Sequence, residues 1–396
     1  MRWLRQTIAV TLLNLRTVPG RLGSSAVAVI GIAGVVVVFV SVLSIAAGFT
    51  AAMQQSGSPD RALVMRTGAD SEMTSGLGGP DVDLIKQAPG IAREGQAPLA
   101  SGELYVIIDL PKKATPESGS NVPMRGIEPL GMQVRDEVSL IEGRMLQFGT
   151  NEVVVGRGAH AQFVNLDVGT EVRSGQNTWR VVGVFEADGG VAESEIWADA
   201  RTLQSVYARG NSYQSTLVRL ESEASFDAFK DWVTTNPQLN VMVRRENEYY
   251  AAQSRALSTL IQTLGFAIAF LMGIGAVFGA ILTMYTAVAT RAREIATLRA
   301  LGFNTGSVLV SVLGESIALA AIGGIIGGIA AYVGFNGYQT STMNFQTFSQ
   351  VAFAFRVTPA LLIMGIVYAL MMGLVGGLLP AIRAARLPIP SALREL

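Results

Sequence analysis

The chain has 396 residues, of which 50% are hydrophobic and 15% are charged, and its mean hydropathy is +0.39. Soluble domains carry about 25% charged residues, so this composition indicates a membrane protein. The 30 basic and 30 acidic residues cancel, which leaves no net positive field for nucleic acid. With no Cys and one His, the chain lacks the residues for disulfides, thiolate chemistry and the usual zinc sites.

Four apolar stretches are long enough to cross a bilayer as helices, which takes about 20 residues. They predict transmembrane helices at residues 25–47, 256–290, 307–335 and 359–379. The first apolar run is longer than the roughly 7 to 15 residues of a signal peptide, so we expect an uncleaved anchor. Residues 1–24 set apolar side chains beside arginines and predict an amphipathic helix on the cytoplasmic leaflet, or a plain extension of the first span.

The arginines predict the orientation of these spans. They gather before the first span, in the link at residues 291–303 and in the tail at residues 380–396. The loop at residues 336–358, predicted to be a short periplasmic loop, carries Arg356 alone. By the positive-inside rule, both termini and the link lie in the cytoplasm, and the protein is a multi-pass protein of the inner membrane.

Residues 48–255 have the composition of a soluble domain with stalk ends. Patterns of alternating hydrophobicity predict strands at residues 62–65, 104–108, 152–155, 180–185 and 239–243, and helices at residues 81–87 and 225–234 with Ser225 as an N-cap. The element order predicts a mixed, porter-like subdomain into which a strand-rich subdomain, about residues 131–208, is inserted. The expected fold class is an α-helical membrane protein with four transmembrane helices and a large α+β extracytoplasmic domain.

The second span is predicted to continue outward as a helical stalk. The segment from residue 246 to residue 291 contains no Pro. A helix of that length, at 1.5 Å per residue, is roughly twice as long as the 30 Å apolar core of a bilayer is thick. The segment after the first span, residues 48–56, is expected to extend beside it.

No catalytic, cofactor or metal site is predicted. The sequence has no GxxxxGK[ST] phosphate loop, no HExxH and no GxSxG. We therefore expect a protein that is not itself an enzyme.

Glycines four residues apart allow two membrane helices to approach closely, although Gly is also common in membrane spans for other reasons. The candidate packing pairs are Gly275 with Gly279, Gly323 with Gly327, Gly324 with Gly328, and Gly373 with Gly377. Glu315 is an acidic residue inside an apolar span. We expect it to pair with an arginine such as Arg291 or Arg299, and a role in ion or proton movement is the alternative.

The link between the second and third spans reads Arg-Ala-Arg-Glu-Ile-Ala-Thr-Leu-Arg-Ala-Leu-Gly-Phe over residues 291–303. Ile295, Leu298 and Leu301 stand at helical spacing, and Gly302 is placed to end the helix. A short amphipathic helix of this kind either rests on the membrane surface or fills a groove in a soluble partner.

This link resembles the coupling-helix motif R-x-x-E-I-x-x-L-R-A-L-G of the FtsX-like and MacB-like, or type VII, permeases of ABC transporters. The residues of the predicted coupling site are Arg291, Arg293, Glu294, Ile295, Leu298, Arg299, Leu301 and Gly302, and all but Arg293 match the motif, as does Ala300. Ala296 stands where the family often has Gly. The layout of one span, a large outer domain and three further spans is also similar to that of the LolC-like and LolE-like permeases.

The resemblance implies a permease subunit that transmits the ATP-driven motion of a separate ATPase to the outer domain, for export or extraction of a substrate. ATP would be bound by that partner, and the chain itself would hold no cofactor. Ile295 and Leu298 would enter a groove on the ATPase, with Glu294 and Arg299 setting the register. Other implied partners are a second copy or a paralogous permease and membrane lipid, and an efflux assembly would add a periplasmic adaptor and an outer-membrane channel. The alternative is an FtsX-like regulator that activates a cell-wall hydrolase or a signalling partner.

The topology is testable with reporter fusions. Because the arginines cluster at the two ends and in the link, reporters fused after Arg21, Leu301 and Leu396 should report cytoplasm. A reporter within residues 131–208 should report periplasm, and a cytoplasmic signal from that fusion would overturn the predicted orientation.

Overall fold

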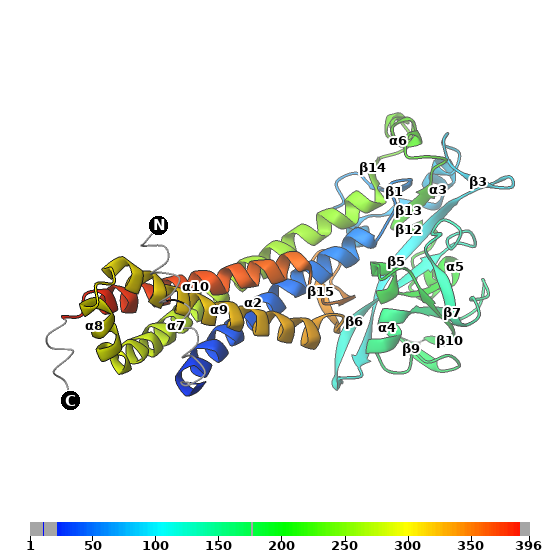
Figure 1. The fold of residues 1–396 in the computed structure, drawn as a ribbon. Coiled ribbons are helices and arrows are strands. Elements are labelled where there is room, and N and C mark those ends of the chain that lie inside the picture. Colours follow the sequence, from blue (N-terminus) through cyan, green and yellow to red (C-terminus); the bar gives the residue numbers. More distant parts are fainter. Residues whose placement is uncertain (1–10, 12–21, 176, 389–396) are drawn as a thin grey trace. The chain divides into compact units, whose positions relative to one another are not determined.

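The computed structural model describes residue 11, residues 22–175 and residues 177–388. It divides into two compact units, shown in Figure 1. A helical unit contains the described parts of Met1–Ala47, Leu260–Tyr338 and Phe355–Leu396, and an α/β unit contains Gly48–Thr259 and Gln339–Ala354. The predicted amphipathic helix at residues 1–24 and the end of the tail lie almost wholly outside the described residues.

Four helices of the described chain are long and apolar enough to cross a membrane, which confirms the four predicted spans. They are α2 (Leu22–Gln55), α7 (Glu246–Thr290), α9 (Thr305–Phe335) and α10 (Pro359–Ala385), and α8 (Ala292–Ala300) lies between α7 and α9 in the chain. The absence of Pro lets α7 run unbroken for 45 residues, as expected for a stalk. Helix α2 likewise continues past the predicted first span, to Gln55.

Glycines on α9 bring it close to both α2 and α10. A Cβ added at Gly327 would lie 2.6 Å from the carbonyl oxygen of Ala33 on α2, and one at Gly324 would lie 2.8 Å from the Ala369 Cβ on α10. Gly323 also faces α2, Gly328 faces α10, and Gly373 and Gly377 of α10 face α9. Three of the four predicted pairs therefore sit at close helix contacts.

The fourth predicted pair does not pack within the described chain. A Cβ added at Gly275 or Gly279 would meet no atom within 4 Å. The middle of α7 instead exposes large apolar side chains, among them Leu271 and Phe278. The spacing fits a packing motif, but no atom of the described residues packs against these two glycines of α7.

Matched alanine substitutions test this difference. Gly327→Ala should lower the melting temperature of the full chain in detergent, because the backbone oxygen of Ala33 cannot move without separating the helices, at a cost of about 1–3 kcal/mol. Gly279→Ala meets open space and should leave stability equal or raise it, since Ala favours helix over Gly by about 1 kcal/mol. Equal losses in both variants would contradict the packing described for α9.

The α/β unit is built on one ten-stranded sheet, in the order β14-β1-β13-β5-β6-β11-β8-β10-β7, with β9 paired to β10. Its strands are β1 (Arg61–Arg66), β5 (Ala100–Lys112), β6 (Thr115–Ile127), β7 (Ser139–Gly143), β8 (Glu152–Gly156), β9 (Glu171–Ser174), β10 (Asn177–Glu186), β11 (Ile196–Asp199), β13 (Ser215–Arg219) and β14 (Val241–Arg245). Two short pairs flank it, β2 (Leu77–Gly78) with β12 (Ser212–Tyr213) and β3 (Arg93–Glu94) with β4 (Ala97–Pro98).

Apart from the end of α2 and the start of α7, the helical elements of this unit are short. They are η2 (Glu72–Thr74), α3 (Gly79–Ile85), α4 (Arg157–Gln162), η3 (Val191–Ser194), α5 (Ala200–Val206) and α6 (Ser225–Thr235). Helix α6 begins at Ser225, but Ala224 holds the N-cap position, so the predicted N-cap is wrong by one residue. The Ser225 hydroxyl instead forms a hydrogen bond with the Ser222 hydroxyl, at 3.1 Å.

Strand β5 joins the two halves of the sheet. Its first residues, from Ala100 to Glu103, pair with β13, and the residues from Leu104 onward pair with β6. One hydrophobic core lies under α3 and α6, and a second lies among β5, β6, β8, β10 and β11. The two halves thus share one continuous strand, and the strand-rich half includes residues 104–127, which were predicted to lie in the mixed subdomain.

Residues 336–358 were predicted to be a short loop, and this prediction is incomplete. They contain a β-hairpin of β15 (Gln339–Asn344) and β16 (Ser349–Ala354). The hairpin packs within the α/β unit, where the Ala352 N–H donates to Ser194 Oγ at 2.7 Å and Tyr105 O–H donates to Ser349 Oγ at 3.1 Å. The apolar alternation of residues 349–354 was the sequence signal that could have revealed it.

A buried arginine holds three carboxylates together beside the shared strand. Arg125 on β6 is 2% exposed and contacts Glu72, Glu103 and Glu195 at 2.7, 2.6 and 2.7 Å. Arg135 binds both oxygens of Glu103, at 2.7 and 2.8 Å. Burial alone would raise the pKa of Glu103, but attraction to Arg135 and Arg125 outweighs burial and lowers that pKa.

Removing this arginine should destabilise the whole α/β unit. Arg125→Met leaves the carboxylates of Glu72 and Glu195 buried without their cation, which costs about 3–5 kcal/mol, and thermal unfolding of the full chain measures the loss. Arg125→Lys should recover only part of the lost stability, because an ammonium group cannot reproduce the five fixed donors of a guanidinium. Arg173→Met, at an exposed arginine of β9, is the control and should change little. A melting temperature of Arg125→Met equal to that of the control would rule out this role.

Candidate functional site

An ion pair joins the start of α8 to α9. Arg291, at the N-cap position of α8, places Nη1 3.2 Å from Oε2 of Glu315, and both side chains are less than 10% exposed. This confirms that Glu315 pairs with an arginine and identifies Arg291 as its partner. Arg299, the other candidate, donates instead to the backbone carbonyl of Leu387.

The end of α8 is fixed by a glycine in the left-handed region. Gly302 has a φ of +93°. Glycine adopts this conformation at little energetic cost because it has no Cβ. Its N–H donates to the Arg299 carbonyl at 3.1 Å, and the Phe303 N–H donates to the Leu298 carbonyl at 3.2 Å. These two bonds form a Schellman motif, so the predicted helix stop at Gly302 is confirmed.

The inner face of α8 packs on its own bundle. Ile295 is 7% exposed and Ala296 is 1% exposed. Ile295 belongs to a hydrophobic cluster with Met284, Val288, Val308, Val312, Leu319, Ala381 and Ala384. The expectation that Ile295 enters a partner's groove is therefore corrected: its side chain is occupied within the chain.

The outer face of α8 is open. Exposed residues recur at the spacing of a single helical face, and they are Arg293, Glu294, Thr297, Ala300 and Leu301. Leu301 is 73% exposed, although it is large and apolar. Leu298, the second predicted anchor, is half-buried between the two faces. Sequence periodicity placed Leu301 with Ile295, whereas the structure places them on opposite faces.

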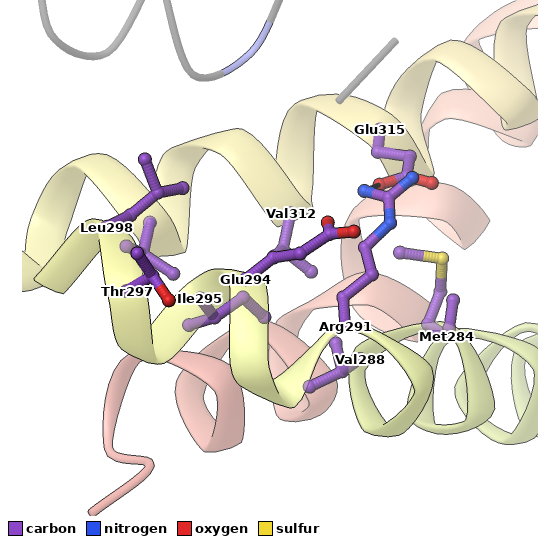
Figure 2. Close-up of a pocket in the computed structure, with 11 residues that line it drawn as sticks. Met284, Val288, Arg291, Glu294, Ile295, Thr297, Leu298, Val312 and Glu315 are labelled. Atoms are coloured by element: carbon purple, nitrogen blue, oxygen red, sulfur yellow. Dashed lines mark hydrogen bonds and ion pairs between the residues drawn. The ribbon is translucent and has the colours of Figure 1, made fainter. Parts of the chain in front are cut away.

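A cavity of about 290 Å³ lies where α8 meets α7 and α9. Its lining includes Met284 and Val288 from α7, Ile295 and Leu298 from α8, and Val312 from α9. Figure 2 shows Arg291 reaching from the start of α8 toward Glu315 at one end of this lining. The cavity is mainly apolar, and the Arg291–Glu315 ion pair at its edge is formed within the chain.

Across residues 22–175 and 177–388, no three or more His, Cys, Asp or Glu side chains are grouped so that they could hold a metal ion.

Two family models match this sequence, and together they cover most of it. Residues 25–236 match the MacB-like periplasmic core domain, and residues 266–389 match the FtsX-like permease C-terminal domain. The second match includes α8 and the exposed face described above.

Similar curated proteins are macrolide export ATP-binding/permease proteins. MacB 1/2 of Paracoccus denitrificans is 26% identical over 241 residues, which cover 58% of this chain and 34% of that protein. MacB of Bradyrhizobium diazoefficiens is 28% identical over 252 residues, which cover 58% of this chain and 36% of that protein. The chain thus spans about a third of the length of these relatives.

Two solved structures are also similar. The extracellular domain of the noncanonic ABC-type transporter YknZ from Gram-positive bacteria matches 46% of this chain and 99% of its own, with 16% identity and a TM-score of 0.36. The periplasmic region of MacB from Actinobacillus actinomycetemcomitans matches 51% of this chain and 96% of its own, with 14% identity and a TM-score of 0.38.

Proposed function

Because the chain belongs to the FtsX-like ABC transporter permeases with a MacB-like periplasmic core domain, we propose that an ABC ATPase binds the exposed face of α8. The observation that carries this proposal is the exposure of Leu301 at the end of α8, on the same face as Arg293 and Glu294, while the other face of the helix is buried. An exposed apolar anchor on a face that also carries charges of both signs is suited to a groove on a soluble partner.

The attachment of α8 supports a role in transmitting force. The Arg291–Glu315 ion pair ties its start to α9, and Ile295 packs among side chains of α7, α9 and α10. A push on α8 would therefore move these helices together. Helix α7 then runs unbroken to Glu246, whose carboxylate pairs with Arg61 of the α/β unit. We propose mechanotransmission along this path, for export or extraction of a substrate outside the inner membrane.

The partners follow from the same proposal. ATP hydrolysis is assigned in this proposal to a separate ABC ATPase. A second copy or a paralogous permease would complete a two-fold assembly, and the exposed apolar face of α7 would meet it or the lipid. Both termini and α8 are assigned to the cytoplasm, and a periplasmic adaptor with an outer-membrane channel remains part of the export proposal.

A charge at the exposed anchor should abolish ATPase binding. Leu301→Asp replaces the apolar contact with an ion that a groove would bury unpaired, so capture of the ATPase by the tagged permease in detergent should fall at least about tenfold. Detergent removes the membrane surface, which separates partner binding from lipid contact. Leu298→Asp should also weaken capture, because Leu298 is half-buried at the edge of the same face.

The matched control is Leu140→Asp, which makes the same change at an exposed leucine of β7. It should retain ATPase binding. Ile295→Asp should instead lower the melting temperature, because Ile295 is buried in the bundle. Wild-type capture by Leu301→Asp would refute the coupling role of the α8 face.

A further inference from the structure

A second, polar cavity of about 370 Å³ lies within the α/β unit. Its walls come from segments far apart in the sequence: Asp70 and Ser71 before η2, Arg244 on β14, Gln253 on α7, and Gln346 in the turn of the β15–β16 hairpin. Its volume falls in the lower part of the roughly 300–1,000 Å³ range of small-molecule sites. None of these residues belongs to the α8 site.

A chain of hydrogen bonds sets the orientation of the Gln253 amide. The Gln346 backbone N–H donates to Asn344 Oδ1 at 3.0 Å, so the other end of the Asn344 amide must be its donor. Asn344 Nδ2 donates to Gln253 Oε1 at 2.7 Å. Gln253 Nε2 is therefore the free end of its amide, with two N–H donors.

These donors are buried without an acceptor. Gln253 is 5% exposed, and its Nε2 has no hydrogen-bond partner among the described residues. The hydroxyl of Ser71, which is 1% exposed, also lacks a partner there. Leaving a buried polar group unpaired costs about 1–3 kcal/mol, so two such groups lining one cavity indicate a place for hydrogen-bond acceptors from outside the chain.

Two opposite charges line the same cavity. The Arg244 side chain is half-buried and the Asp70 side chain is exposed, and neither makes an ion pair or a side-chain hydrogen bond with another described residue. An anion alone would be repelled by Asp70, and a cation alone would leave the donors of Gln253 and Arg244 unused. A ligand with both charges satisfies the whole set.

We propose that this cavity binds a small zwitterion that carries a carboxylate and an ammonium group, either a free amino acid or a short peptide. The carboxylate accepts hydrogen bonds from Gln253 Nε2 and the Arg244 guanidinium, with the Ser71 hydroxyl as a further donor. The ammonium group lies next to Asp70. This site does not depend on the role proposed for α8, so each can fail without the other.

Calorimetric titration of the full chain in detergent tests the ligand chemistry. The probes are alanine and Ala-Ala, which distinguish an amino acid from a peptide, together with N-acetyl-Ala-Ala, which lacks the ammonium group, and Ala-Ala amide, which lacks the carboxylate. We expect saturable binding of at least one free zwitterion, and at least tenfold weaker binding of both blocked peptides. The proposal is overturned if neither free probe binds at concentrations up to about 10 mM, or if the blocked peptides bind equally well.

Variants place the binding in this cavity. Gln253→Glu retains an oxygen for Asn344 but replaces both N–H donors with a carboxylate that repels the ligand, so binding should be lost. Arg244→Ala removes a side chain that makes no ion pair or side-chain hydrogen bond with another described residue, and it should weaken binding at least tenfold with an unchanged melting temperature. Arg173→Ala, at an exposed arginine of β9, is the matched control and should bind as wild type does. Unchanged affinity in Arg244→Ala would overturn the assignment of the site.

Discussion

The α/β unit depends on the guanidinium of Arg125, which is fully enclosed and neutralised by carboxylates from three separate segments. Glu72 comes from η2, Glu103 from the point where β5 changes its pairing partner, and Glu195 from the residue before β11. A buried charge is tolerated only when its partners are held at hydrogen-bonding distance. The cluster therefore fixes the two halves of the sheet relative to one another.

A second ionic cluster lies where α7 enters this unit. Arg61 on β1 contacts Glu246, the first residue of α7, and also Glu137. The stalk helix is thus joined to the sheet by a buried ion pair between Glu246 and Arg61 of β1, which suits an element that is proposed to transmit motion.

The two proposed binding sites differ in the physics they use. The face of α8 offers an exposed leucine and, further along the helix, charges of both signs, which suits a protein groove that excludes water. The cavity beside Gln253 offers unpaired donors and separated charges, which suit a small polar ligand. Gln253 lies on α7 and its amide is oriented by Asn344 of the hairpin. A ligand in that cavity would therefore contact α7, the same helix that is proposed to transmit the ATP-driven motion.

Local properties of the sequence were enough to predict the four spans, the unbroken α7 and the helix stop at Gly302. Apolar length, the absence of Pro and the tolerance of Gly for positive φ act over a few neighbouring residues, so no tertiary information is needed. The pairing of Glu315 with an arginine also followed, because an intramembrane carboxylate requires a cation nearby.

Tertiary structure decided the remaining features, each of which depends on partners distant in sequence. Apolar periodicity could not show that Ile295 faces the bundle while Leu301 faces outward, because α8 has apolar side chains on both faces and only the positions of α7, α9 and α10 select between them. Sequence also could not show that Gly275 and Gly279 make no close helix contact, because their spacing is identical to that of the packed pairs. Arg125 could not be assigned its carboxylates from sequence, since burial and proximity across the sheet, and not spacing along the chain, determine which charges meet.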